Sequence, residues 1–185
     1  MFRRAGDGET DMVDRSFAHL PGKLWTPVRT KPRREKKLAE FCRAKGIEYY
    51  LPLLRRMHSY GSKSAEFFVP MFPGYIFCLL DDNLYQTLVT SHAVLFRINM
   101  SEKEEIALLE ELNGVKEVEK MSAEQEVVVK PELVDGTPVR VKSGPLTGTR
   151  GIVKARKDKL TLTINIELLG QSVSAEIRAT ELEED

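Results

Sequence analysis

The chain contains few of the residues on which metal and cofactor chemistry usually depends. Its 185 residues include two cysteines, three histidines and a single tryptophan. Cys42 and Cys78 stand far apart without a CxxC motif, and no histidine lies at ligand spacing from another histidine or from a cysteine. We therefore expect neither a metal site nor a bound cofactor. Free, buried thiols in a reducing compartment are the simplest interpretation of the two cysteines.

Long apolar runs and the common catalytic motifs are missing as well. No segment approaches the roughly 18 consecutive apolar residues that span a bilayer, and residues 1–22 lack the apolar core of a secretory signal. The sequence contains no dinucleotide-binding GxGxxG motif, no phosphate-loop motif and no GxSxG motif. We therefore expect a cytoplasmic protein that is not an enzyme and has no membrane partner.

The net charge of zero hides a strong segregation of charge along the chain. Residues 23–79 carry 12 lysines and arginines against 4 acidic residues, whereas residues 80–135 carry 5 against 13. A basic block of this size attracts phosphate groups even in a neutral protein. The alternative is that the charges cluster on a solvated surface that has no partner.

Hydrophobic periodicity and turn signals predict an N-terminal domain of mixed helices and strands. Pro32 is expected to open a basic helix that Gly46 ends, and Ser101 and Glu104 form a capping box for another helix, which Asn113-Gly114 ends. A hairpin tip is expected at Gly61-Ser62. In chain order we predict a strand at 24–30, a helix at 32–45, strands at 47–54 and 75–80, a helix at 83–89, a strand at 94–98, a helix at 101–112 and a short strand at 127–129.

From residue 136 onward the apolar residues recur with a period of two. Leu160, Leu162, Ile164 and Ile166 alternate with polar residues, which predicts a strand with one buried face. Several short strands in so short a segment bury such a face by closing into a small barrel. The predicted organisation is a flexible tail at 1–22, a domain at 23–129, a linker at 130–135 and a barrel domain at 136–185.

An apolar strand in the N-terminal domain predicts a partner site. Tyr75 and Phe77 lie on one face of the strand at 75–80, and both faces of that strand are apolar, so both need cover. The predicted helices suffice for one face of the sheet. This leaves an exposed aromatic patch of Phe72, Tyr75 and Phe77, which is typical of a docking surface. The alternative is that these rings belong to the core.

Basic side chains gather at two places in the first domain. One is the start of the helix at 32–45, where they oppose the helix dipole, and the other is the hairpin, where Tyr60 stands among them. Basic groups mixed with an aromatic ring suit single-stranded nucleic acid, although a solvated helix face also explains the first group. The expected nucleic-acid contacts are Lys31, Arg33, Arg34, Lys37, Arg55 and Arg56.

Two motifs resemble those of a known family. The segment PMFPGYIF at 70–77, after a strand opened by Trp25, resembles the NGN domain of NusG-type transcription factors. The VxVxxGPxxGxxG spacing at 139–151 resembles their KOW domain, and the resemblance runs from Leu24 to Glu183. It implies an α+β protein. An NGN-type mixed α/β sandwich, with about three helices on an antiparallel sheet, is followed by a small five-stranded KOW-type β-barrel.

The resemblance also implies a function. NGN domains bind the clamp helices of bacterial RNA polymerase and favour processive elongation, so the chain is expected to be a monomeric elongation or antitermination factor. By motif, the polymerase contacts are Phe72, Tyr75, Phe77 and Thr87. The basic side chains are expected to face the non-template DNA strand or the nascent RNA. The KOW domain is expected to recruit a ribosomal protein or a termination factor through Leu168, Leu169 and Gly170.

Some positions depart from the family pattern. Thr26 and Pro27 replace the usual aromatic and aliphatic pair, and Leu169 stands where an aromatic residue is used in partner docking. Together with the acidic stretch at 102–126, these departures indicate a specialised paralog of the RfaH-like kind that serves selected operons. The alternating strand at 160–166 argues against refolding of the second domain into helices. The alternative function is that of a ribosome-associated, RNA-binding KOW protein.

Overall fold

The computed structural model describes residues 16–60, 63–122, 127–131, 136–156, 159–178 and 181–184. In chain order the elements are β1 (Leu24–Thr30), α2 (Glu35–Lys45), β2 (Tyr49–Tyr50), β3 (Leu53–Tyr60), β4 (Lys63–Pro70), β5 (Tyr75–Leu80), α3 (Asp82–Val89), β6 (Val94–Arg97), α4 (Glu102–Met121), β7 (Val128–Pro131), β8 (Thr137–Val141), β9 (Arg150–Arg156), β10 (Lys159–Ile166), the 3-10 turn η1 (Glu167–Leu169), β11 (Gln171–Ile177) and β12 (Leu182–Glu184). Helices and antiparallel sheets confirm the predicted α+β class. None of the helices described is both long and apolar enough to cross a membrane.

The chain divides into two compact units. One contains Met1–Leu51 and Pro73–Ile106, and the other contains Pro52–Phe72 and Ala107–Asp185. The hairpin and most of α4 therefore group with the C-terminal strands. The domain boundary predicted from the sequence stays a prediction.

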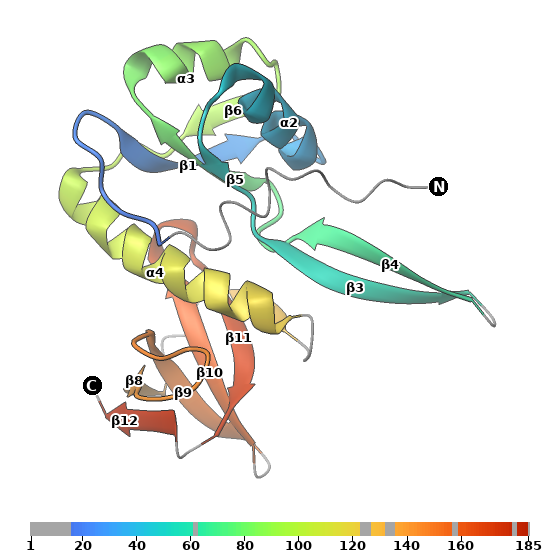
Figure 1. Cartoon of the computed structure of the whole chain (residues 1–185), viewed down its shortest axis with the longest axis vertical. Helices are drawn as coiled ribbons and strands as arrows, with labels where there is room; N and C mark the ends of the chain where they lie inside the picture. Colours follow the sequence, from blue (N-terminus) through green and yellow to red (C-terminus); the bar gives the residue numbers. More distant parts are fainter. Residues whose placement is uncertain are drawn as a thin grey trace. The chain divides into compact units, whose positions relative to one another are not determined.

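The first unit is built on a four-stranded antiparallel sheet in the order β2-β5-β1-β6. β1 and β5 pair along their length, with Pro27 opposite Phe77. Side chains alternate across a strand, so Cys78 points to the face opposite Phe77. The Sγ of Cys78 lies 4.0 Å from the Sγ of Cys42 on α2. α2 therefore covers this face, and Figure 1 shows it beside β5.

The predicted strands at 24–30 and 75–80 are confirmed as β1 and β5, but the strand at 47–54 is divided between β2 and the first two residues of β3. Pro27 lies in a central strand, although it lacks the N–H that a ladder needs. Its carbonyl accepts the N–H of Ile98 at 2.9 Å. The register between β1 and β6 shifts after Pro27, between Arg29 and Thr30.

α2 begins later than the sequence predicts. Arg34 is its N-cap residue, so Pro32 lies in a turn before the helix and not at its first position. The preceding Arg33 has a φ of 59°, and this left-handed backbone interrupts the helix at its start. The predicted end is confirmed, because Gly46 closes the helix with a φ of 65°.

α4 begins as predicted. The N–H of Ser101 donates to the carboxylate of Glu104 at 2.7 Å, and the hydroxyl of Ser101 accepts the N–H of Glu104 at 3.3 Å. These two bonds form the capping box that the sequence predicts.

α4 does not end at Asn113-Gly114, as the sequence predicts, but continues to Met121. A Cβ on Gly114 would lie 2.9 Å from Thr149 and 3.1 Å from Ile164. This close approach to the C-terminal strands explains why α4 tolerates an internal glycine, which costs about 1 kcal/mol relative to alanine. The buried stripe of the helix contains Leu108 and Leu112 before the glycine and continues after it with Val115 and Val118.

The second unit contains a six-stranded antiparallel sheet in the order β12-β8-β9-β10-β11-β7. The strand predicted at 160–166 is confirmed within β10, and Leu162, Ile164 and Ile166 are buried as expected, but Thr163 on the opposite face is buried too. A strand is found near the one predicted at 127–129. It forms β7, which pairs with β11 and places Val128 opposite Ser174. The first two residues of the predicted linker, 130 and 131, lie in β7, and the rest lies outside the described residues.

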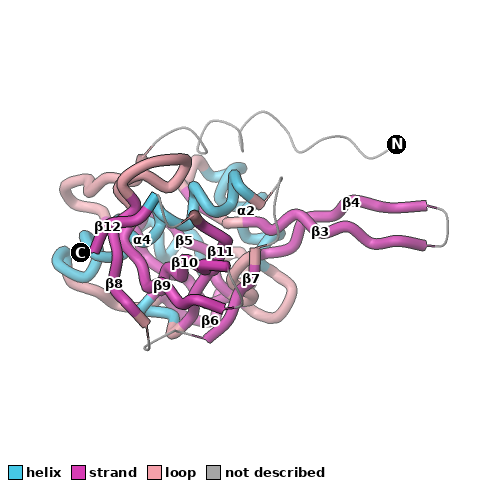
Figure 2. Tube along the Cα trace, turned by 90° about the horizontal axis from the view of Figure 1, so that it is seen from below, coloured by secondary structure: helices cyan, strands magenta, loops and turns pink. Residues whose placement is uncertain are grey.

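The predicted hairpin is confirmed as a separate ribbon of β3 and β4. Its pairs run from Leu53 opposite Pro70 to Tyr60 opposite Lys63, and the tip at 61–62 lies outside the described residues. Figure 2 shows the two strands side by side along their length. The ribbon is joined to α4, because the N–H of Leu53 donates to the carboxylate of Glu119 at 2.6 Å.

A segment before β1 packs on the first sheet. We call residues 16–23 the N-terminal strap. Phe17 within it is buried, and Leu20 pairs with Lys23 in an isolated bridge. Residues 16–22 therefore do not fit the flexible tail predicted at 1–22, because the ring of Phe17 anchors them. Residues 1–15 of that prediction lie outside the described residues.

Candidate functional site

Exposed basic side chains surround the start of α2. They are Lys31, Arg33, Arg34, Lys36 and Lys37, which we call the basic cluster. The acidic residue among them, Glu35, is buried, and its carboxylate accepts the N–H of Gly74 at 2.6 Å. Because the carboxylate is turned inward while the basic side chains face solvent, this surface keeps its positive charge.

The N-terminus of α2 adds to the positive potential of the basic cluster. Its N-cap residue, Arg34, forms no side-chain capping hydrogen bond. The first N–H groups of a helix lack intrahelical partners and attract anions. Uncapped N–H groups beneath exposed cations form a surface that suits phosphate.

The turn at Pro73-Gly74 is tied to β1 next to the basic cluster. The N–H of Thr30 donates to the carbonyl of Gly74 at 2.8 Å, and Nη1 of Arg29 donates to the carbonyl of Pro73 at 3.3 Å. The same guanidinium lies 4.6 Å above the ring of Tyr75. A Cβ on Gly74, whose φ is 85°, would lie 2.6 Å from Nη1 of Arg29. Only glycine therefore fits here, and the turn holds Tyr75 beside the cations.

Of the three rings expected to form a partly exposed aromatic patch, Tyr75 alone reaches the surface. Phe72 is 1% exposed and Phe77 is 0% exposed, while Tyr75 is half-buried. The prediction of exposure is therefore wrong for Phe72 and Phe77. Cover for Phe77 comes from outside the helices: its ring centroid lies 6.3 Å from that of Tyr50, which lies 4.9 Å from that of Phe17.

The N-terminal strap is held by a buried carboxylate as well as by its ring. Glu105 of α4 is 0% exposed and accepts the N–H of Trp25 at 2.7 Å. Nδ1 of His19 donates to the other oxygen of Glu105 at 2.5 Å. This hydrogen bond raises the pKa of His19, and the negative charges of Glu105 and Glu102 raise it further. Phe17 meets Trp25 edge to face, with ring centroids 4.9 Å apart.

Sequence reasoning missed this arrangement. Phe17 and His19 stand in a stretch without periodicity, and Glu105 is one of several acidic residues in α4. No local pattern distinguishes the buried glutamate from its exposed neighbours. The one available signal was Phe17 itself, a large apolar side chain in an otherwise polar segment.

The predicted contact Thr87 lies on α3. Its side chain is half-buried, and its hydroxyl donates to the carbonyl of Asn83 at 3.1 Å. Gln86 beside it is exposed. Asp81 caps this helix, since its carboxylate accepts the N–H of Leu84 at 2.8 Å.

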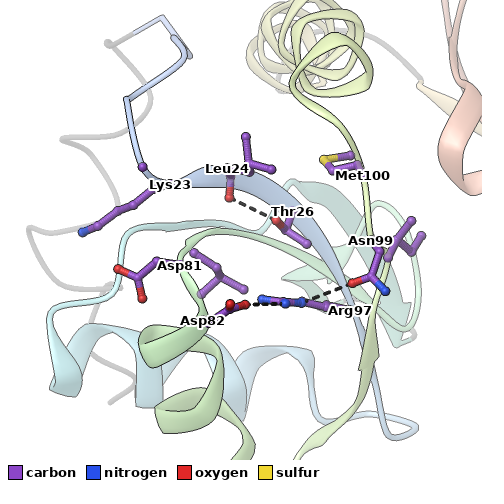
Figure 3. Close-up of a pocket in the computed structure, with 11 residues that line it drawn as sticks. Lys23, Leu24, Thr26, Asp81, Asp82, Arg97, Asn99 and Met100 are labelled. Carbon is purple, nitrogen blue, oxygen red and sulfur yellow. Dashed lines mark hydrogen bonds and ion pairs between the residues drawn. The ribbon is translucent and has the colours of Figure 1, made fainter.

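A polar pocket of about 300 Å³ lies at the end of β1 that is remote from the basic cluster. Arg97 within it donates to Asp82 at 2.7 Å and to Asn99 at 3.3 Å, as Figure 3 shows. Its guanidinium also lies 4.4 Å above the ring of Tyr85. These groups bond to one another, which is the geometry of a structural cluster. Across the described ranges, no group of histidine, cysteine and acidic side chains is arranged to hold a metal ion.

The two predicted arginines of the hairpin lie on opposite faces of the ribbon, because neighbouring residues of a strand alternate. Arg55 forms an ion pair with Glu66 at 2.5 Å, and Arg56 donates to the carbonyl of Val127 at 3.5 Å. Both belong to the second unit, whereas the basic cluster belongs to the first. The side chain of Tyr60 lies outside the described side chains. The exposed apolar side chains of the ribbon are Met57, Phe67 and Phe68.

The predicted partner site of the second unit lies between β10 and β11. Leu168 and Leu169 are half-buried in the turn η1, and Gly170 is exposed with a φ of 58°. The three residues are contiguous at one end of the sheet, so this short turn presents its apolar side chains in part to solvent.

These features define a two-unit α+β protein whose first unit presents a basic surface beside a half-buried tyrosine. A family model described as "Transcription termination factor nusG" matches residues 23–136. The chain therefore belongs to the NusG family, which confirms the family resemblance of its motifs. Members of this family are transcription factors that bind RNA polymerase, so a general role in transcription elongation and its regulation follows.

A comparison with solved structures finds two that are similar to this chain. One is described as "Domain interaction in Thermotoga maritima NusG"; it is 19% identical, covers 88% of this chain and 97% of its own, and has a TM-score of 0.44. The other is described as the MjSpt4:Spt5 complex in conformation B; it is 15% identical, covers 87% of this chain and 96% of its own, and has a TM-score of 0.27. A comparison with curated protein sequences finds no match.

Proposed function

We propose that the chain binds RNA polymerase and promotes processive elongation or antitermination at selected operons in the cytoplasm. The first unit supplies both parts of this activity. Tyr75 docks on an apolar surface of the polymerase, while the basic cluster contacts a single strand, either the non-template DNA or the nascent RNA.

The observation that carries this proposal is the separation of charge at the start of α2. Glu35 is buried and bonded to Gly74, whereas the basic cluster is exposed beside the uncapped end of the helix. A cluster that merely solvated the helix would not need its acidic member turned inward. Phosphate contact explains this arrangement, because it stabilises cations that the helix dipole opposes.

The proposed docking contact is narrower than the one the sequence predicts. Tyr75 is the half-exposed ring, and Arg29 lies above it. Aromatic and arginine side chains are frequent anchors at protein interfaces. Phe72 is buried, so in the proposal it supports the turn before Tyr75. Thr87 keeps its role as a proposed second contact on α3.

The second unit is proposed to recruit a partner through the turn after β10. Leu168, Leu169 and Gly170 offer a small apolar surface, which suits a ribosomal protein or a termination factor. Arg55 and Arg56 are proposed as further contacts to nucleic acid from the hairpin.

Charge reversal tests the nucleic-acid contact. The variant with Arg33, Arg34 and Lys37 each changed to Glu is compared with Lys45→Glu, which reverses an exposed charge at the other end of α2. Each lost phosphate contact lowers the salt dependence of single-strand binding by about 0.7 in log–log slope, so the triple variant is expected to lose about 2. Lys45→Glu is expected to keep the wild-type slope. Equal slopes for both variants would refute the proposed interface.

The activity itself is tested by in-vitro elongation on a template with a terminator. Wild-type protein is expected to increase read-through, and Tyr75→Ala is expected to lower both polymerase affinity and read-through. Loss of a central aromatic contact typically costs about 2 kcal/mol, or about thirtyfold in affinity. Wild-type protein that neither binds polymerase nor changes read-through would refute the proposed function.

A further inference from the structure

The N-terminal strap covers the aromatic face of the first sheet. On this face Trp25 and Tyr50 contact the ring of Phe17, which is 7% exposed, and Tyr50 in turn contacts Phe77. This is the face of Tyr75 as well, because alternate residues of β5 share a side. The strap therefore lies on the same face of the sheet as the proposed polymerase contact.

The contacts described for the strap come from one ring, one backbone bridge and one side-chain hydrogen bond. They are the contacts of Phe17 with Trp25 and Tyr50, the bridge between Leu20 and Lys23, and the bond from His19 to Glu105. Burial of the ring is opposed by the entropy lost when a whole segment is ordered. Leu20 is 44% exposed and adds little burial.

What lies under the strap resembles a binding site in its chemistry. Opening it uncovers aromatic rings next to the carboxylate of Glu105, which is 0% exposed and retains only the N–H of Trp25 among the hydrogen bonds described. A buried carboxylate needs a positive partner or hydrogen bonds to remain charged. The site therefore accepts a bulky apolar side chain together with one basic group, which is what Phe17 and His19 supply.

We propose that the N-terminal strap is a displaceable occupant of the polymerase-docking site, and that a polymerase segment with a bulky apolar side chain and a neighbouring basic side chain replaces Phe17 and His19. This inference rests on the proposed function and deepens it. It also makes the rings of Trp25 and Tyr50, which are buried in the free protein, available for docking.

The bond to Glu105 makes the strap sensitive to pH. The charged groups that act on His19 are Glu105 and Glu102, both on α4, and they raise its pKa. A group whose pKa is raised on closing stabilises the closed state while it is protonated, and this contribution is lost as the pH rises through the raised pKa. The strap is therefore expected to open more readily at higher pH.

The test uses the full chain and three single variants. Phe17→Ala removes the ring, His19→Gln keeps a hydrogen-bond donor but removes the titration, and Leu20→Ala is a matched control in the same segment. Trp25 is the only tryptophan of the chain, so quenching of its fluorescence by acrylamide reports how far the strap is open. Affinity for core RNA polymerase is measured in parallel across pH.

The proposal predicts that Phe17→Ala exposes Trp25 to the quencher and binds polymerase more tightly. If the strap is closed in about nine molecules of ten, the gain is about tenfold, because the competent state is then always populated. His19→Gln is expected to tighten binding at low pH and to flatten the pH dependence, and Leu20→Ala is expected to change neither readout.

The outcomes separate this inference from the proposed function. Polymerase binding by the wild type, with equal or weaker binding by both Phe17→Ala and His19→Gln, would overturn the strap proposal and leave the proposed function standing. Absence of binding by every variant would overturn the proposed function and the choice of partner together. Trp25 quenching that is independent of pH and of His19→Gln would show that the strap is a fixed part of the core, even if Phe17→Ala fails to fold.

Discussion

Replacement of Glu35 by alanine is expected to destabilise the first unit. The carboxylate is buried and accepts the N–H of Gly74 at 2.6 Å. A hydrogen bond to a charged group contributes about 1.5–3 kcal/mol, and a buried donor left without a partner costs about 1–3 kcal/mol. The carboxylate also favours the start of α2 by about 0.3–1 kcal/mol. Because the first two figures describe one interaction, we expect a total loss of about 2–3 kcal/mol.

Urea denaturation followed by the fluorescence of Trp25 measures this loss, since Trp25 belongs to the same compact unit. Glu35→Gln retains an acceptor oxygen, so its free energy of unfolding is expected to fall by about half as much as that of Glu35→Ala. Glu40→Ala removes an exposed carboxylate from the same helix and is expected to stay within about 0.5 kcal/mol of wild type. If Glu35→Ala were as stable as Glu40→Ala, the carboxylate would not be holding the turn at Gly74.

Two further substitutions test packing and capping. Gly151→Ala would place a Cβ 2.6 Å from the backbone oxygen of Thr163. Calorimetry is therefore expected to show that the free energy of unfolding falls by about 1–3 kcal/mol. A melting temperature equal to that of the wild type would contradict the close approach of β9 and β10. Ser101→Ala removes the capping box of α4 and is expected to cost about 1 kcal/mol. Hydrogen bonds from Ser101 lower the pKa of Glu104, and stability that depends on a lowered carboxyl pKa is lost as the pH falls through it. Denaturant titrations are therefore expected to show that the difference in free energy of unfolding between wild type and Ser101→Ala becomes smaller in acid. A difference that is constant with pH would argue against this cap.

Local signals in the sequence were sufficient where one residue type decides the backbone. Gly46 ends α2 and Ser101 opens α4 because each acts on its own turn, and the alternation of β10 reports a buried face directly. The order of the helices and strands in the first unit followed from such signals. The family motifs added the functional class, which the NusG family match confirms.

Long-range packing decided the features that the sequence could not predict. Asn113-Gly114 is a strong stop signal, yet Thr149 and Ile164 occupy the space beside the glycine and α4 continues. The exposure of Phe77 was predicted by counting helices, whereas Phe17, far from it in the chain, belongs to the cover. The burial of Glu105 depends on three separate segments and leaves no local pattern. Docking and nucleic-acid contacts at the predicted residues stay predictions.

The paired thiols between α2 and β5 have a practical consequence for labelling. Cys42 and Cys78 are both 0% exposed, and burial, followed by the hydrogen bond to Cys42, raises the pKa of Cys78 well above its ordinary value. Thiols of this kind are inert towards maleimides and similar reagents in the native state. A fluorophore can therefore be attached to a cysteine introduced at an exposed position without first removing the native pair. The rate at which Cys42 and Cys78 themselves react slowly with such a reagent then measures how often the first unit opens.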